Sequence, residues 1–103
     1  MNCKYDIDID VETILTNLSR LQSQIFKLLP MHEEELDCVK PLETISIELL
    51  GMYKLFPQRE DILALICKLE GLFTLTSDED FQLYRRTIFE CLGLLSDIKN
   101  NVD

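Results

Sequence analysis

The most constraining stretch of this sequence is its most apolar one, residues 61–75, which reads DILALICKLEGLFTL. Ten of the fourteen residues from 62 to 75 are apolar, and the four interruptions are Lys68, Glu70, Gly71 and Thr74. A helix this apolar should be covered by neighbours on most of its sides. The stretch therefore predicts a central helix, over residues 59–75, in a small helical bundle.

Three other segments carry apolar residues with helical spacing. The clearest is 11–29, followed by 42–56 and 78–98, each with apolar residues three or four positions apart. The chain has 103 residues, of which 47% are hydrophobic and only three are glycine. That is enough for one core. We expect a single all-α domain over residues 1–103, an antiparallel up-and-down bundle of four main helices.

The connections are set by prolines and acids. Pro30 is expected to end the first helix, because proline cannot donate a hydrogen bond to the preceding turn. A short extra helix around 31–38 would follow, with His32 solvated in its first turn. At Pro41 the chain either breaks or kinks, and we favour a break. The alternation in residues 5–11, YDIDIDV, predicts an extended N-terminal arm over 1–9 that ends in an Asp10 helix cap.

All three glycines, Gly51, Gly71 and Gly93, fall inside predicted helices. A glycine in the middle of a helix costs about 1 kcal/mol relative to alanine. We therefore expect each to mark a close approach of a neighbouring helix or a bend.

The formal charge is −9, from 19 acidic and 10 basic residues. This argues against direct nucleic-acid binding, which needs surplus lysine and arginine, and against binding to anionic membrane surfaces. A basic protein partner stays open, as does the simpler interpretation that the charge serves solubility. The start has no apolar signal-peptide region and no run reaches bilayer length, so we expect a soluble cytoplasmic protein. The four cysteines are expected to be reduced thiols.

No catalytic signature is visible. The only histidine is His32, and no pair of metal ligands has the spacing of a zinc site. The spacing of Asp6, Asp8 and Asp10 resembles a calcium loop, but such a loop needs glycine at Val11 and an acid at Asn17. We expect no enzyme activity, no cofactor and no metal.

The surplus of apolar residues is the best indication of function. Beyond one stripe per helix, the sequence carries Ile47, Leu50, Leu55, Leu63, Leu75, Leu83, Phe89 and Leu94. Glu70 is an acid set within the most apolar run. These nine residues either wrap a central helix or form a surface for a partner. We expect a protein-interaction module, such as an adaptor, chaperone or regulator, and a homodimer as the simplest assembly. The alternative is an inhibitor or immunity protein, perhaps phage- or mobile-element-encoded, that neutralises a basic nucleic-acid-processing enzyme.

Overall fold

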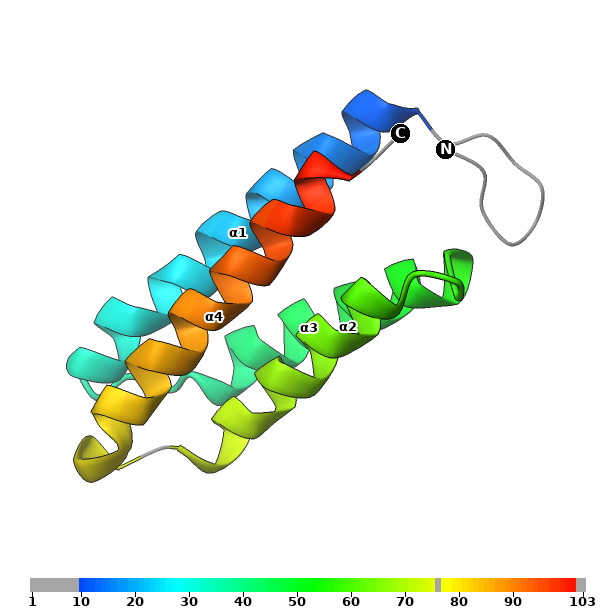
Figure 1. Cartoon of the computed structure of the whole chain (residues 1–103). Coiled ribbons are helices and arrows are strands. Elements are labelled where there is room, and N and C mark those ends of the chain that lie inside the picture. The colour runs from blue at the N-terminus through cyan, green and yellow to red at the C-terminus, as the bar shows by residue number, and fades with distance from the viewer. Residues whose placement is uncertain (1–9, 76, 102–103) are drawn as a thin grey trace.

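The computed structural model describes residues 10–75 and 77–101. Its α-helices are α1 (Val11–Glu33), α2 (Val39–Leu55), α3 (Glu60–Glu70) and α4 (Phe81–Asn100), with short 3-10 helices η1 (Gly71–Thr74) and η2 (Asp78–Asp80). Consecutive α-helices pack side by side, and α4 also packs against α1, which closes an elongated bundle of 46 × 19 × 19 Å (Figure 1). The prediction of an all-α bundle of four main helices is confirmed. None of the helices described is long and apolar enough to cross a membrane.

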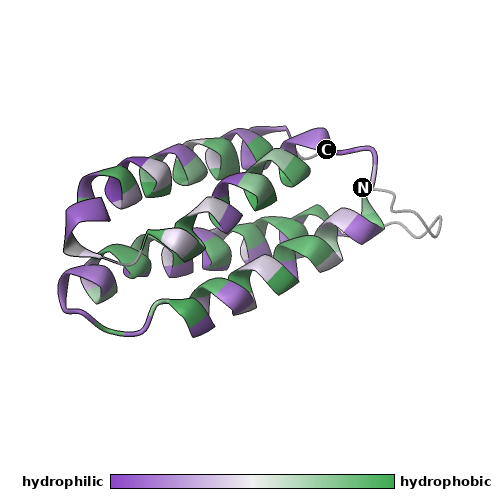
Figure 2. Cartoon of the chain, turned by 90° about the horizontal axis from the view of Figure 1, so that it is seen from below, coloured by the Kyte–Doolittle hydropathy of each residue, from purple (hydrophilic) through white to green (hydrophobic). Residues whose placement is uncertain are grey.

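Each helix turns one apolar stripe toward the bundle axis, and apolar and polar segments alternate along every ribbon (Figure 2). In α1 the buried residues follow the spacing expected for one helix face. The fully or almost fully buried side chains of the four helices include Leu18, Leu21, Ile25, Leu28, Leu42, Ile45, Leu49, Leu65, Leu69, Tyr84, Ile88, Cys91 and Leu95. One continuous core therefore runs through the bundle.

The most apolar stretch is not a central helix, contrary to expectation. α3 is only 11 residues long and packs against α2 and α4, while Leu63, Ala64 and Cys67 are exposed. In a ring of four helices each member has two neighbours, so the outer face of α3 stays open. The chain from Gly71 onward leaves the α-helix for the 3-10 turn η1.

The expectation for Pro30 was wrong. α1 continues through Pro30, which is exposed, and ends only at Glu33. No separate helix forms over 31–38, because residues 31–33 belong to α1 and residues 34–38 are a connection. The favoured break is present, but it precedes Pro41, which lies in the first turn of α2. Proline is tolerated there because the first helical N–H groups have no intrahelical partner.

The predicted Asp10 cap is present. The Asp10 side chain accepts a hydrogen bond from the Glu12 backbone N–H at 3.3 Å. Before α4, the Ser77 hydroxyl donates to the Asp80 carboxylate at 2.9 Å, next to the 3-10 turn η2. The predicted arm over residues 1–9 lies outside the described residues.

The glycines do not mark close approaches of neighbouring helices. A Cβ atom at Gly51, Gly71 or Gly93 would meet no heavy atom within 4 Å. Gly51 and Gly93 lie in helix interiors on exposed faces, so packing does not account for the missing side chains.

We therefore expect Gly51→Ala and Gly93→Ala each to raise the free energy of unfolding by about 0.5–1 kcal/mol, because alanine loses less backbone entropy in a helix. Urea denaturation followed by circular dichroism measures the change. A loss of stability in either variant would show that a neighbour does pack against that glycine.

Candidate functional site

The nine residues predicted to bind a partner do not gather in one place. Their exposed apolar members are Ile47, Leu50, Leu63, Leu83 and Phe89. Leu55, Leu75 and Leu94 are partly buried and pack against the core, which gives them a role within the chain. Glu70 is exposed at the end of α3.

Four of the nine share the outer side of α2 and α3. Glu48 of α2 pairs with Arg20 of α1 at 2.9 Å, so this side of α2 faces α1. Leu50 lies two residues further, about 200° around the helix, and therefore on the α3 side. Lys68 of α3 likewise pairs with Glu90 of α4 at 2.7 Å, and Leu63 lies about 140° away, on the α2 side.

We call this surface the α2–α3 face and define it by Ile47, Leu50, Leu63 and Glu70. The exposed fractions of its apolar members are 69% for Ile47, 45% for Leu50 and 40% for Leu63. Ile47 and Leu50 are one turn apart on α2, and the short connection to α3 brings Leu63 alongside. The face is thus apolar at its middle. Other exposed charged residues of α2 and α3 include Glu43, Lys54 and Glu60.

The remaining predicted residues lie elsewhere. Leu55 lines a hollow of about 340 Å³ between α1 and α2, next to Arg20 and Glu48. Leu83 and Phe89 are on α4, where the Arg85 guanidinium lies 5.4 Å from the centre of the Phe89 ring. These positions are separated from the α2–α3 face by intervening helix surface.

Three exposed apolar residues lie outside the predicted set: Phe26, Leu36 and Val39. Phe26 lies in the apolar segment 11–29, but it follows the buried Ile25 and so points about 100° away from it.

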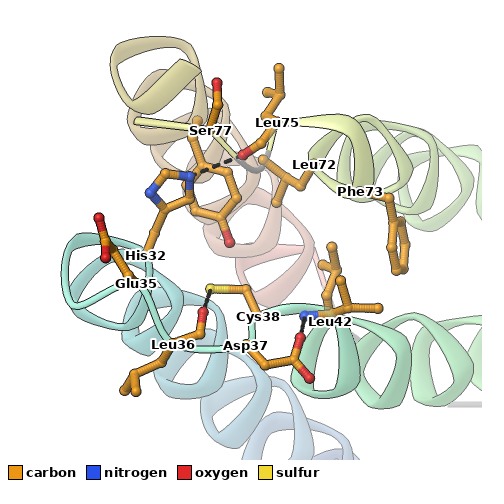
Figure 3. Close-up of a pocket in the computed structure, with 12 residues that line it drawn as sticks. His32, Glu35, Leu36, Asp37, Cys38, Leu42, Leu72, Phe73, Leu75 and Ser77 are labelled. Atoms are coloured by element: carbon orange, nitrogen blue, oxygen red, sulfur yellow. Dashed lines mark hydrogen bonds between the residues drawn. The ribbon is translucent and has the colours of Figure 1, made fainter. Parts of the chain in front are cut away.

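A pocket of about 380 Å³ opens at the end of the bundle where α1 ends and α2 begins (Figure 3). Its walls come from the end of α1, the 34–38 connection, the start of α2, residues 72–75 and 77, and Tyr84 of α4. The apolar lining residues are Leu36, Val39, Leu42, Leu72, Phe73 and Leu75, and the polar ones are His32, Glu35, Asp37, Cys38, Ser77 and Tyr84.

His32 is the structural link at this end, and the expectation that it would be solvated was wrong. Its side chain is only 7% exposed, and its Nε2–H donates to the Leu75 carbonyl oxygen at 3.0 Å (Figure 3). Its ring centre lies 4.4 Å from that of Tyr84 and 5.3 Å from that of Phe81. The last turn of α1 is thereby tied to the segment after η1 and to the start of α4.

Tyr84 places a buried polar atom at the pocket. The residue is 1% exposed, and its hydroxyl makes no well-directed hydrogen bond within the described chain. Burial, and to a lesser degree the nearby Cys38 thiol, raise the pKa of Tyr84, so the hydroxyl stays protonated. The Cys38 thiol itself points to the Leu36 and Leu28 carbonyl oxygens, at 3.6 and 3.8 Å.

Glu35 adopts a backbone conformation that is unusual for its type. Its φ is 59°, in the left-handed region. The Glu35 N–H donates to the His32 carbonyl oxygen and the Leu36 N–H to that of Met31, at 3.1 and 2.9 Å. This pair of hydrogen bonds is the Schellman motif, whose left-handed position is usually glycine. A non-glycine residue there costs roughly 1–2 kcal/mol.

Glu35→Gly is therefore expected to raise the free energy of unfolding by about 0.5–1 kcal/mol. The backbone strain that glycine relieves in the folded state is larger than the entropic free energy by which glycine stabilises the unfolded chain. Glu34→Gly is the matched control, because Glu34 has an ordinary φ of −85° and should lose stability on substitution. Chemical denaturation of both variants measures the difference. A loss of stability in both would contradict the strained conformation at Glu35.

Acidic side chains without ion pairs gather around this pocket. Glu33, Glu34, Glu35 and Asp37 are exposed, and none forms an ion pair with another described residue. Elsewhere, acids such as Glu48, Asp61 and Glu90 are paired with arginine or lysine. The side-chain hydrogen bond from Arg59, for instance, lowers the pKa of Asp61. Exposed acids without a described ion pair, such as Glu43 and Asp97, also lie elsewhere, but four occur close together at the pocket end.

The described cysteines differ in exposure: Cys67 is exposed, Cys38 is half-buried and Cys91 is buried. Cys38, Cys67 and Cys91 are unpaired, as predicted for these three, whereas Cys3 lies outside the described residues. Burial raises the pKa of the Cys91 thiol to about 12, which keeps it protonated. Within residues 10–75 and 77–101, no three histidine, cysteine or acidic side chains converge as metal ligands would.

Comparison with known proteins identified no related protein. No family model matches the sequence, and neither the curated proteins nor the solved structures contain a significant match. Function must therefore be inferred from the chain's own surfaces.

Proposed function

We propose that this chain is a non-enzymatic cytoplasmic protein-interaction module that binds a basic protein partner through the α2–α3 face. The observation that carries the proposal is the exposure of Ile47, Leu50 and Leu63 together on one side of the bundle. Core packing does not require them, because each helix already buries a complete stripe. Apolar side chains grouped in this way commonly mark protein-binding surfaces.

The apolar part of the face would supply most of the binding free energy. Burying apolar surface contributes about 25 cal/mol per Å², and a few central residues usually dominate an interface. Ile47 and Leu50 are the central residues here, since both are exposed and only one turn apart. Glu43 and Glu70 would contact the partner at the edge.

Charge favours a partner of opposite sign over a second copy of the chain. Each chain carries a net charge of −9, so two identical faces would approach against mutual repulsion. A basic surface would instead be attracted to the acids that surround the apolar centre. Self-association through the same face is the competing outcome.

The test compares the wild-type chain with the double variant Ile47→Ser, Leu50→Ser. Each is immobilised and exposed to a lysate of the source cells, and the retained proteins are quantified by mass spectrometry. We expect a basic protein to be retained by the wild type and reduced at least about tenfold with the double variant, because truncating central interface residues typically costs 1–2 kcal/mol each. Binding of the purified pair then confirms direct contact.

Phe26→Ser combined with Phe89→Ser is the matched control, since it removes two exposed apolar side chains from α1 and α4. The amount of basic partner retained by this control should stay within about twofold of the amount retained by the wild type. Equal losses with both double variants, or none with either, would contradict the assignment of the α2–α3 face.

The alternative, an inhibitor or immunity protein for a basic nucleic-acid-processing enzyme, has one observation in its favour. Glu33, Glu34, Glu35 and Asp37 form an uncompensated acidic cluster at one end of the bundle. Such a cluster could oppose the cationic groups that normally hold nucleic acid. In that case binding would depend on this end rather than on Ile47 and Leu50.

The distinguishing measurement is the association rate with the retained partner at several salt concentrations. For the inhibitor, Glu33→Gln with Glu34→Gln should slow association by about three- to tenfold at low salt, because long-range attraction steers the encounter. Glu12→Gln with Asp97→Asn removes the same two charges at the opposite end and serves as control. A rate that is insensitive to both pairs and to salt would exclude electrostatic inhibition.

A further inference from the structure

We propose that the pocket at the α1–α2 end of the bundle binds a small amphiphilic amine. Such a ligand has an apolar, preferably aromatic body, a hydrogen-bonding group at its inner end and an ammonium group at its outer end. This site is distinct from the α2–α3 face and does not depend on the function proposed for that face.

The size and walls of the pocket suit a small organic molecule. Its volume of about 380 Å³ lies in the range of small-molecule sites, which are mostly apolar with a few polar groups. Leu42 and Leu72 form buried parts of the wall, and Phe73 adds an aromatic side chain (Figure 3). The Leu75 carbonyl oxygen is already occupied by His32, which holds that side of the wall in place.

The inner polar group is the Tyr84 hydroxyl. It is buried without a well-directed partner, and it lies near Cys38, which also lines the pocket. A buried polar group without a partner costs free energy that a suitable ligand group can recover. A ligand hydroxyl or similar group beside Cys38 would form that hydrogen bond.

The charge at the mouth selects a cation. Glu35 and Asp37 are exposed lining residues, and no lysine or arginine is among the lining residues of the described chain. One Asp37 oxygen accepts the Val39 N–H at 2.9 Å. Glu35 lines the pocket from a left-handed backbone position where glycine would be less strained. An anionic ligand would meet two like charges here.

Three probes of matched size test the proposal: tyramine, phenethylamine, which lacks the hydroxyl, and 4-hydroxyphenylpropionate, which has the opposite charge. Binding is followed by NMR titration of the backbone amides. We expect saturable shifts around His32, Cys38 and Tyr84 with tyramine. Affinity should fall about threefold or more for phenethylamine and about tenfold or more for the carboxylate.

Two variants assign these preferences to residues. Tyr84→Phe keeps the ring in the core and should remove the advantage of tyramine over phenethylamine. Glu35→Gln should reduce the preference for the amine over the carboxylate. The Ile47→Ser, Leu50→Ser double variant is the control and should bind tyramine as the wild type does. The proposal of a ligand in the pocket can therefore fail or succeed independently of the proposal of a partner at the α2–α3 face.

The proposal is overturned if no probe gives saturable shifts at the pocket, or if the amine and the carboxylate bind equally. It is also overturned if Tyr84→Phe lowers the affinity for tyramine and phenethylamine by the same factor, since the hydroxyl would then make no specific contact. The wild-type series alone gives an answer if Tyr84→Phe folds poorly.

Discussion

The bundle is held together by the burial of one apolar stripe from each of its four helices. Side chains such as Leu18, Leu49, Leu65 and Leu95 are completely buried along the bundle axis. Because α1 and α4 close the ring, the core needs nothing further from the chain. Apolar residues outside these stripes are therefore left on the surface, where each costs solubility unless something covers it.

The ends of the helices create the second distinctive region. α1 passes through Pro30 and stops in a Schellman motif, which places Glu35 and Asp37 beside the start of α2. The hydrogen bond from His32 to Leu75 brings the segment after η1 to the same place. Together these segments form a pocket with apolar walls, a buried hydroxyl and acidic side chains at its mouth. It lies at the start of α2, whereas the connection to α3 follows the end of α2. Two surfaces of different chemistry thus share one small scaffold.

The sequence predicted the helices well because their apolar spacing reports directly on burial. It predicted the site less well, for physical reasons that particular residues show. Leu63 and Leu55 are both off-stripe leucines, yet only Leu63 is exposed, and the difference depends on which neighbour lies beside each helix. His32 looked solvated among three glutamates, but its burial arises from Leu75 and Tyr84, more than forty residues away in sequence. The pocket could not be predicted from local sequence, because parts of the chain that are far apart in sequence, around residues 32–42, residues 72–77 and Tyr84, line it together.

If a single chain completes its own core, the α2–α3 face is not needed for folding. Thermal unfolding of the purified chain over a hundredfold range of protein concentration distinguishes the cases, because the midpoint of an obligate dimer rises with concentration. We expect a midpoint that does not change with concentration, together with the sedimentation mass of a 12.0 kDa monomer at the lowest concentration. A midpoint that rises steadily with concentration, with a dimer mass throughout, would show that the core is completed only by a second chain.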